Sequence, residues 1–297
     1  MTKVSGIVMA SAVTFSFEFF PPQSIEASFR LSETVRALAP LSPAFVSVTY
    51  GAGGTTRTLT HDAVGTIHRN YGLNVAAHLT CVNASREETL AIADSYADIG
   101  VTEIVALRGD PPKGATGFTP HPDGFANSVE LVEALAATGK FRLHVGAYPD
   151  PHPEAPYAGA DVDWLKRKID AGAHSAITQF FFEVDHFLRF RDACVAAGID
   201  APIIPGILPI ENWKGTRNFA KRCGTPVPDW LDAQFDTAIA DNRHDDLALQ
   251  LSIDMSKRLV AEGVGHLHFY TLNKPQLSRH VVSALGLAPA DIAEVAV

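Results

Sequence analysis

Short apolar, β-rich runs recur along the chain and alternate with segments of helical periodicity. The strand-like runs read as nearly continuous apolar stretches, as expected for strands that are covered on both faces. They cover residues 13–19, 44–50, 74–82, 103–109, 142–148, 175–182, 202–208 and 266–272. We therefore expect parallel strands with helices packed against them.

The segments between these runs carry helix signals. Ser85, followed by Glu87 and Glu88, has the pattern of a capping box. Residues 161–173 carry apolar side chains at positions 162, 165 and 169 before a terminal glycine, which is typical of a short amphipathic helix. The interval 209–265 must hold more than one helix. Eight βα units in 297 residues predict a (β/α)8 TIM barrel with extra helices between strands seven and eight.

A doubly wound sheet is the structural alternative, and it would ordinarily carry a glycine-rich phosphate-binding motif. Gly51 and Gly53 follow a strand, but Thr56 stands where G-x-G-x-x-G needs its third glycine, so we reject that motif. The Pro- and Gly-rich residues 112–124 predict a long loop at the active face rather than a domain boundary.

Composition narrows the class of protein. A net charge of −9 argues against nucleic acid or an anionic membrane as the main partner, although a local cluster of Arg and Lys can still bind an anionic small molecule. No basic region followed by a long apolar run opens the chain, and no stretch reaches the roughly 18 apolar residues of a spanning helix. Cys81, Cys194 and Cys223 form no CxxC pair, which indicates reduced thiols. We expect a soluble, cytoplasmic protein.

Polar residues gather at the carboxyl ends of the predicted strands, where barrels of this type carry their chemistry. Any one of them could simply contact solvent or a loop, but nearly every strand supplies one, which indicates a site. They are Glu18, Thr49, Tyr50, His78, Thr80, Arg108, Asp110, Tyr148, Gln179, Tyr270 and Asn273.

Glu18 lies within the run VTFSFEFFPP, residues 13–22. Phe17 and Phe19 point to the other side of the strand. We expect the apolar setting to desolvate the Glu18 carboxyl, to raise its pKa and to keep part of it protonated near neutral pH.

Other pairs leave alternatives open. Arg108 and Asp110 share one side of a continuing strand and are either an ion pair or two groups around a polar ligand. His266 and His268 form a His-x-His pair typical of metal-dependent barrel hydrolases, but they begin their strand, away from the expected site. The proline-rich loop 148–156 either presents His152 and Glu154 at the mouth or is a stiff crossover.

Motifs in order from about residue 13 to 285 resemble the catalytic domain of the methylenetetrahydrofolate reductase family, of the bacterial single-domain kind. The quoted stretches are FSFEFFPP, FVSVTYGAGG, AHLTCV, IVALRGDPP, AYPDPHPEA, LKRKIDAGA, AITQFFFEVDHFLRFRDAC, IIPGILPI and HFYTLNK. The resemblance implies that residues 1–297 are one FAD-binding (β/α)8 domain without a C-terminal regulatory domain.

The same resemblance implies the activity. Hydride passes from NADH or NADPH to FAD and then to 5,10-methylenetetrahydrofolate, giving 5-methyltetrahydrofolate by a ping-pong route, in a homo-oligomer that needs no nucleic acid, membrane or metal. The sequence does not distinguish NADH from NADPH. A flavin-free folate-binding relative and a metal-dependent hydrolase built on His266 and His268 are the alternatives.

Site residues follow from the resemblance. Glu18 matches the general acid, and Asp110 matches a carboxylate that contacts folate and tunes the flavin. The remaining substrate-binding positions are Gln179, Phe219, Tyr270 and Lys274. The cofactor-binding positions are Thr49, His78, Arg108, Gly109, Asp110, Asn127, Ser128, Tyr148, His152, Ala155, Asp161, Arg167 and Lys168.

Three positions depart from the family's usual pattern. Lys274 stands where an arginine usually meets the glutamate tail of the folate, so the charge is kept but the bidentate fork is lost. Trp164 and Asn127 stand where the cofactor site often has a smaller polar residue and a tyrosine. In the predicted helix 161–173, the run LKRK at residues 165–168 offers several cationic donors to a diphosphate.

Overall fold

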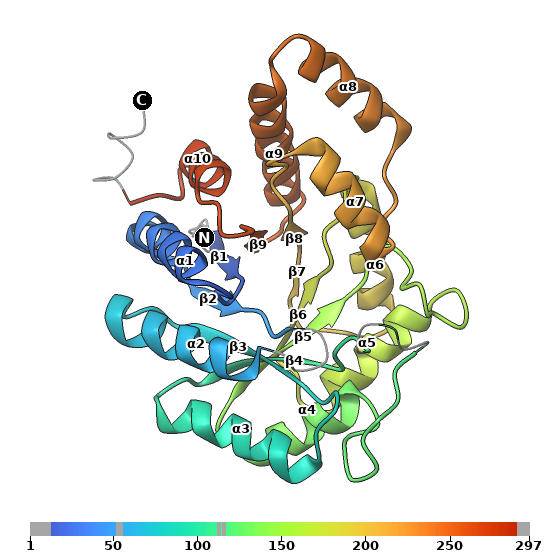
Figure 1. Cartoon of the computed structure of the whole chain (residues 1–297). Coiled ribbons are helices and arrows are strands. Elements are labelled where there is room, and N and C mark those ends of the chain that lie inside the picture. The colour runs from blue at the N-terminus through green and yellow to red at the C-terminus, as the bar shows by residue number, and fades with distance from the viewer. Residues whose placement is uncertain (1–12, 52–55, 112–113, 115–116, 290–297) are drawn as a thin grey trace, which may run out of the picture.

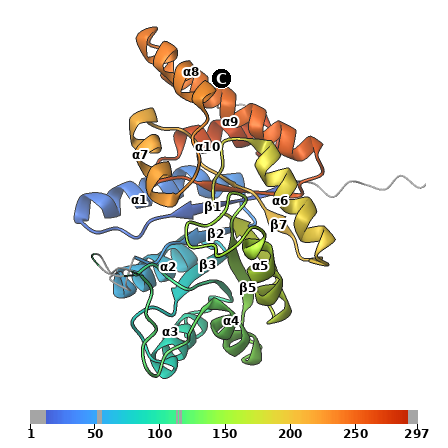
Figure 2. The ribbon, with the colours of Figure 1, turned by 90° about the vertical axis from the view of Figure 1, so that its right-hand side faces the viewer.

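The computed structural model describes residues 13–51, 56–111, 114 and 117–289. Their strands form one parallel sheet that curls into a barrel surrounded by helices (Figures 1 and 2). The strands are β1 (Thr14–Phe19), β2 (Phe45–Val48), β3 (Val75–Thr80), β4 (Glu103–Leu107), β5 (Arg142–Ala147), β6 (Ser175–Thr178), β7 (Ile203–Ile204), β8 (Gly206–Ile207) and β9 (His266–Tyr270). The predicted (β/α)8 barrel is confirmed.

Two of these segments are halves of the seventh predicted strand. β7 pairs with β6, and β8 pairs with β9, so the chain passes from one neighbour to the other at Pro205. Proline has no backbone N–H to donate to a sheet, which explains the interruption of the strand there. The carbonyl of Pro205 still accepts a hydrogen bond from the backbone N–H of His268 at 3.1 Å. The eight predicted strands thus appear as nine segments around one ring.

Helices follow the strands around the barrel. They are α1 (Ile25–Leu38), α2 (Arg57–Tyr71), α3 (Arg86–Asp98), α4 (Ser128–Ala137), α5 (Ala160–Asp170), α6 (Val184–Ala196), α7 (Trp213–Cys223), α8 (Asp229–Ala240), α9 (His244–Ala261) and α10 (Gln276–Ala284), with a 3-10 turn at Ala39–Leu41. The interval 209–265 holds α7, α8 and α9, as predicted. Figure 1 shows α8 and α9 projecting beyond the ring of strands.

Local signals fix several of these boundaries. Ser85 caps α3 and forms the predicted capping box with Glu88. Leu165 of α5 is buried, and Gly172 adopts a φ of 115° just beyond the helix end. The predicted strand 175–182 ends earlier, at Thr178, because Phe180 and Phe182 leave the sheet and pack with the buried side chains beneath α7 and α8.

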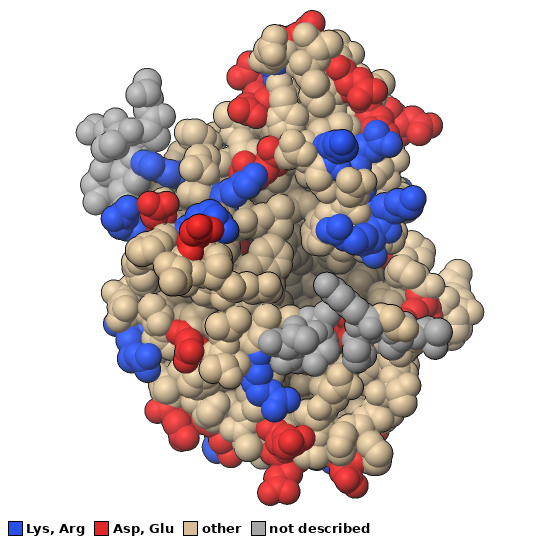
Figure 3. Space-filling model, viewed as in Figure 1, with Lys and Arg blue, Asp and Glu red and all other residues tan. Residues whose placement is uncertain are grey.

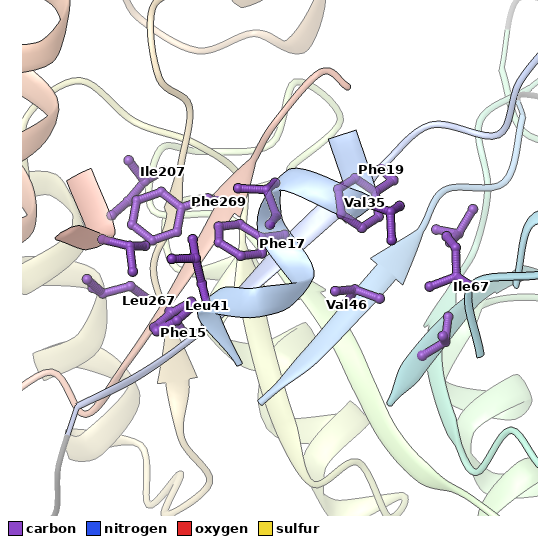
Figure 4. Packing of buried hydrophobic residues seen from close by; sticks show 14 of the residues in the cluster. Phe15, Phe17, Phe19, Val35, Leu41, Val46, Ile67, Ile207, Leu267 and Phe269 are labelled. Carbon is purple, nitrogen blue, oxygen red and sulfur yellow. The ribbon is translucent and has the colours of Figure 1, made fainter. Parts of the chain in front are cut away.

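Alternation along β1 separates the core from the barrel interior. Phe15, Phe17 and Phe19 pack outward with Phe269, and helices close over this cluster (Figure 4). Residues on the opposite face of the same strands point into the barrel. The register of β1 against β9 pairs Thr14 with His266, Ser16 with His268 and Glu18 with Tyr270.

Two further findings concern the cysteines and the helices. The three cysteines are free. Among the helices of the described ranges, none combines the length and the apolar character that crossing a bilayer requires.

Candidate active site

A cavity of about 640 Å³ opens where β3 to β6 end. Its walls come from the segment after β4, the start of α4, the loop after β5, and the inner face of α5. Viewed as in Figure 1, the surface is hollowed near its centre, and Lys and Arg side chains gather on the rim beside α7 (Figure 3). The volume falls in the range of sites for drug-sized and cofactor-sized molecules.

Most of the predicted cofactor-binding residues line this cavity. They are Arg108, Gly109, Asp110, Asn127, Ser128, Tyr148, His152, Ala155, Asp161 and Lys168, and the predicted substrate residue Gln179 joins them. Thr49, His78 and Arg167 are not among the lining residues. The wall also contains Trp164, one of the three departures from the family's pattern. It is completed by residues that the prediction did not assign to the cofactor, including Tyr50, Thr80, Leu107 and Phe118.

Gly109 is required at its position by both backbone and space. Its φ is +87°, and a Cβ there would lie 2.8 Å from a Val82 methyl and 2.9 Å from Cβ of Thr80. A side chain would therefore strain the backbone and push into the wall. The hydroxyl of Thr80 is buried without a hydrogen-bond partner in the described structure, so the cavity wall keeps one unused polar group.

The cationic run on α5 does not act as one cluster. Lys168 is buried and donates a hydrogen bond to the carbonyl of Gly146 at the cavity wall. Burial lowers its pKa to about 8, against the opposing effect of Asp161. Arg167 instead lies 4.3 Å over the Trp164 ring, and Lys166 pairs with Asp170. The helix turns only one of the three cations into the cavity.

Arg108 makes its ion pair with Glu154 at 2.6 Å, not with Asp110. Its guanidinium also lies 5.0 Å from the centre of the Phe118 ring. The pair ties the end of β4 to the proline-rich loop 148–156, and His152 of that loop lines the cavity. Asp110 is exposed. Of the two alternatives for Arg108 and Asp110, the structure does not show the ion pair between them.

Asn127 has a structural task that explains its identity. It is the N-cap of α4, where its side-chain oxygen accepts hydrogen bonds from the backbone of Val129 and Glu130. Asn is among the preferred residues for this position. Asn127 can therefore line the cavity while its oxygen is held by the helix.

A second polar group lies inside the barrel next to the cavity. The Oε2 atom of Glu18 is 3.2 Å from Nε2 of His78 and 3.6 Å from Nε2 of His268. Ser47 donates a hydrogen bond to the same oxygen at 3.3 Å. These four side chains come from β1, β3, β9 and β2, so the closed ring of strands brings them together.

The predicted rise in the pKa of Glu18 is wrong. Burial does oppose the charged carboxylate, but the electrostatic influence of the adjacent His268 and His78 imidazoles outweighs it and lowers the pKa from 4.5 to about 2. The apolar neighbours that prompted the prediction, Phe17 and Phe19, face the outer core. The carboxylate itself faces imidazoles.

Tyr270 stands beside Glu18, its register partner. Its hydroxyl donates to the carbonyl of Thr178 at 2.6 Å, and burial raises its pKa well above 10. Gly206 makes room for it, because a Cβ there would lie 2.5 Å from Cε2 of Tyr270 and 2.2 Å from the Thr178 carbonyl oxygen. The tyrosine is therefore fixed in orientation.

The other predicted residues make separate contacts. Phe219 of α7 stacks on Phe180 with ring centres 5.3 Å apart. Lys274 is exposed beyond the end of β9, and Thr49 donates its backbone N–H to the carbonyl of Phe19. Gln179 accepts a hydrogen bond from the backbone of Phe180. The predicted site thus has a cavity-lining set, which includes Gln179, and an interior set of Glu18, His78 and Tyr270. Phe219, Lys274, Thr49 and Arg167 belong to neither set.

His266 and His268 do not form the ligand set of a metal-dependent hydrolase. Both are hydrogen bonded to Ser16. Across the described ranges, no group of three or more His, Cys, Asp or Glu side chains is placed to hold a metal ion.

The sequence reasoning missed the part of His268, Ser16 and Ser47 in the surroundings of Glu18. The signal was present in the alternation, because Ser16 and Glu18 share one face of β1, as His266, His268 and Tyr270 share one face of β9. What was lacking was the adjacency and register of the first and last strands.

Comparison with known proteins places the chain among folate enzymes. A family model described as methylenetetrahydrofolate reductase matches residues 3–286. The chain is 46% identical over 278 residues to 5,10-methylenetetrahydrofolate reductase of Pectobacterium carotovorum subsp. carotovorum, covering 93% of this chain and 91% of that protein. It is 45% identical over 278 residues to the Escherichia coli (strain K12) protein of the same name, with 93% and 92% covered.

A plant protein and a solved structure are more distant matches. An Arabidopsis thaliana protein named methylenetetrahydrofolate reductase (NADH) 1 is 34% identical over 298 residues, and the match covers 96% of this chain but 50% of the plant protein. A solved structure from Clostridium thermocellum, described as binding two copies of 5-methyl-5,6,7,8-tetrahydrofolic acid, gives a TM-score of 0.58 at 13% identity and covers 96% of this chain and 97% of its own. That likeness supports the fold alone. With the family model spanning nearly the whole chain and two bacterial relatives above 40% identity, the chain belongs to the methylenetetrahydrofolate reductase family.

Proposed function

We propose that this protein is an FAD-dependent reductase that converts 5,10-methylenetetrahydrofolate to 5-methyltetrahydrofolate with NADH or NADPH as the reductant, in a ping-pong reaction. The observation that carries the proposal is the junction of two sites. The cavity of about 640 Å³ is lined by Thr80 of β3, and two residues earlier on the same strand Nε2 of His78 lies 3.2 Å from the interior carboxylate of Glu18.

The cavity suits a large, partly anionic cofactor such as FAD. Lys168 supplies a buried cation at the wall, Ser128 and His152 add polar side chains, and Gly109 is part of the lining. The buried hydroxyl of Thr80 has no partner among the described residues and is available to a ligand. We propose that these residues hold the cofactor without a Rossmann glycine motif. When bound, FAD would supply the hydride chemistry, accepting from the nicotinamide and donating to the folate.

The chain's own task in the folate step is to deliver a proton and to orient the substrate. Glu18 is the proposed donor to the folate nitrogen that must be protonated as the five-membered ring opens. Gln179 and Asp110 lie at the cavity, and Tyr270 borders Glu18, so these three side chains are proposed to hold the folate ring between them. Phe219 is proposed to stack on the bound substrate, and Lys274 to meet its glutamate tail.

The lowered pKa of Glu18 sets a requirement for this role. At neutral pH the carboxylate is ionised, so it must receive a proton while the substrate nitrogen becomes basic. His78 and His268 are the adjacent groups that can carry that proton. We propose that the acid is this three-residue unit rather than an isolated, permanently protonated carboxyl.

The proposal is tested with purified protein. We expect a flavin absorbance spectrum, oxidation of NADH or NADPH when a folate is supplied, and formation of 5-methyltetrahydrofolate. Stopped-flow reduction of the flavin by each nucleotide would show which one it prefers. Protein that binds folate but remains colourless after incubation with FAD would refute the proposal and favour a flavin-free folate-binding relative. The homo-oligomeric state and the absence of a further domain stay predictions.

A further inference from the structure

A continuous line of polar side chains runs from Glu18 through the barrel to its opposite end. Nδ1 of His268 is 2.7 Å from Oγ of Ser16, which is 2.8 Å from Nε2 of His266. Nδ1 of His266 is 2.6 Å from Oγ1 of Thr14, and Thr14 is exposed. Ser16 and His268 are fully buried. The line comes from alternate residues of β1 and β9, which the sheet register sets side by side.

Each member of this line can both accept and release a proton. A neutral imidazole carries one protonated and one free nitrogen, and a hydroxyl both donates and accepts. The pKa of His266 is lowered to about 3 and that of His268 is lowered too, in both cases chiefly by burial. Burial therefore favours the neutral form of both rings, and at His268 the Glu18 carboxylate opposes that effect. The other titratable or charged groups that influence these rings and Glu18 are His78, His144, Arg142 and Tyr270.

The last link is the one between His268 and Glu18. Nε2 of His268 is 3.6 Å from Oε2 of Glu18, is buried and, like Nε2 of His78, has no hydrogen-bond partner in the described structure. A buried ring nitrogen without a partner is costly, so its position facing a carboxylate calls for an explanation. An approach of the carboxylate to about 3 Å would complete the line.

We propose that Thr14, His266, Ser16 and His268 form a proton path that supplies Glu18 from the end of the barrel opposite the active site. The inference rests on the proposed role of Glu18 as the acid. A folate and a large cofactor at the mouth would cover the direct route from solvent to Glu18. Thr14, which is exposed among the described residues, lies at the opposite end of the barrel.

The transfer balances within the chain. A proton from solvent binds Oγ1 of Thr14, whose own proton passes to Nδ1 of His266. Nε2 of His266 releases a proton to Ser16, Ser16 releases one to Nδ1 of His268, and Nε2 of His268 releases one to Glu18. Both imidazoles change tautomer and no net charge stays in the path. Rotation of the hydroxyls and rings restores the starting arrangement for the next turnover.

A second histidine–serine hydrogen bond in the barrel, between His144 and Ser175, resembles the one between His268 and Ser16 but does not lead to Glu18. Nδ1 of His144 is 2.7 Å from Oγ of Ser175, the same length as the His268–Ser16 bond, and Nε2 of His144 is 2.9 Å from Glu103. Ser175 is as buried as Ser16. Removal of the Ser175 hydroxyl therefore reproduces the packing cost of removing that of Ser16, without breaking the path.

The first experiment compares Ser16→Ala with Ser175→Ala in the two half-reactions of the flavin-loaded protein. We expect Ser16→Ala to slow folate reduction about tenfold or more, since general acid catalysis contributes at least that much, and to leave flavin reduction by the nicotinamide within twofold. Ser175→Ala should change neither. Ser16→Thr, which keeps the hydroxyl, should recover most of the rate. Equal rates in Ser16→Ala and Ser175→Ala would overturn the path.

A proton inventory in mixtures of H2O and D2O separates proton delivery from mere positioning of His268. The folate step should show a curved inventory in the parent protein, from several protons in motion, and a linear one in Ser16→Ala. An unchanged inventory with a lower rate would mean that Ser16 only positions the ring, which contradicts the path.

A further measurement does not depend on activity. In 15N-histidine-labelled protein, the ring N–H of buried His268 should exchange with solvent rapidly in the parent and in Ser175→Ala, and at least tenfold more slowly in Ser16→Ala. Equal exchange in all three would overturn the proposal. If Glu18→Gln fails to affect folate reduction selectively, the proposed function fails instead, and the exchange result stands by itself.

Discussion

The two sides of the barrel mouth differ in how their polar groups are satisfied. On the side of β4, β5 and α5, polar side chains such as Asp110 and Ser128 face an open cavity. On the side of β1, β3 and β9, the groups around Glu18 are buried and face one another across strands. The first arrangement leaves donors and acceptors for a ligand, whereas the second fixes a chemical group in a defined environment.

This contrast assigns different work to the two sides. Loops and helix ends shape the cavity, and the sheet itself shapes the surroundings of Glu18. Loop-built walls adapt to a bound molecule, while groups held by strand register keep their geometry. We therefore expect substitutions on the cavity side to change cofactor affinity, and substitutions on the strand side to change the rate of one step.

The largest effect is expected from Glu18→Gln. A glutamine cannot give up a proton, so folate reduction should slow by about a hundredfold or more, while flavin reduction by the nicotinamide stays within about twofold. Stopped-flow absorbance of each half-reaction measures both. Glu103→Gln is the matched control, since Glu103 also pairs with a buried histidine, His144, at 2.9 Å. Equal slowing of the two half-reactions would contradict a specific role as acid.

The same variant tests the environment of Glu18 through pH. The pKa of Glu18 in the folded chain is about 2, below its ordinary 4.5, so its ionised form stabilises the folded state above pH 4.5. That contribution is lost as the pH falls from 4.5 toward 2. Glu18→Gln should therefore lower the free energy of unfolding more at pH 7 than at pH 3, as measured by urea titration. A larger loss at pH 3 would mean that the carboxyl is protonated in the fold.

On the cavity side, Lys168→Met should weaken FAD binding about tenfold or more, because it removes the buried cation. Fluorescence titration of the apoprotein with FAD measures the dissociation constant. Lys166→Met on the same helix is the control, since Lys166 pairs with Asp170 and does not line the cavity. Similar losses in both variants would contradict the assignment of Lys168.

Lys168→Met should weaken FAD binding but raise the free energy of unfolding of the apoprotein. The folded pKa of Lys168 is about 8, below its ordinary 10.5, so the burial cost of its charge is fully present below pH 8 and disappears between pH 8 and 10.5. The apoprotein carrying Lys168→Met should thus gain about 1–2 kcal/mol at pH 7, after the lost hydrogen bond to Gly146 is deducted. The gain should shrink toward pH 10. A loss of stability at pH 7 would show that the ammonium is well compensated.

The contrast between the sides also explains what the sequence could predict. Strand-end polarity located the mouth, because every parallel strand of a barrel ends on one side. Position along a strand does not reveal which strands are neighbours. The pKa of Glu18 was therefore predicted from Phe17 and Phe19, adjacent in sequence, whereas it is set by His78 and His268, which the ring closure brings in.

Pairings across loops were equally out of reach. Arg108 has an acidic neighbour two residues away, yet it pairs with Glu154, 46 residues further along. The capping role of Asn127 could have been found, because Glu130 three residues later is a helix-start signal. Interactions between residues close in sequence can be predicted from the sequence. Interactions between distant strands or loops require knowledge of which strands are neighbours and how they are aligned.

A smaller effect is expected from Gly206→Ala on the strand side. The new Cβ would lie 2.2 Å from the Thr178 carbonyl oxygen and 2.5 Å from Cε2 of Tyr270, so the strand or the tyrosine must shift. Overpacking of this kind costs about 2 kcal/mol. Thermal unfolding measures the loss, and Gly265→Ala, whose Cβ would meet nothing within 4 Å, is the control. Folate reduction should suffer more than FAD affinity, and the reverse order would contradict the division of the mouth.

The smallest effect is expected from Lys274→Arg at the outer edge of the strand side. Lys274 is exposed, so water screens its charge and a contact there contributes little. An arginine adds a planar fork that can bind a carboxylate through two hydrogen bonds, which should tighten folate binding by about 1 kcal/mol, or about fivefold. Equilibrium titration with a folate and with an analogue lacking the glutamate tail measures it. The gain should vanish for the tail-less analogue, because the fork then has no carboxylate to bind; an equal gain for both ligands would place Lys274 against the ring system instead.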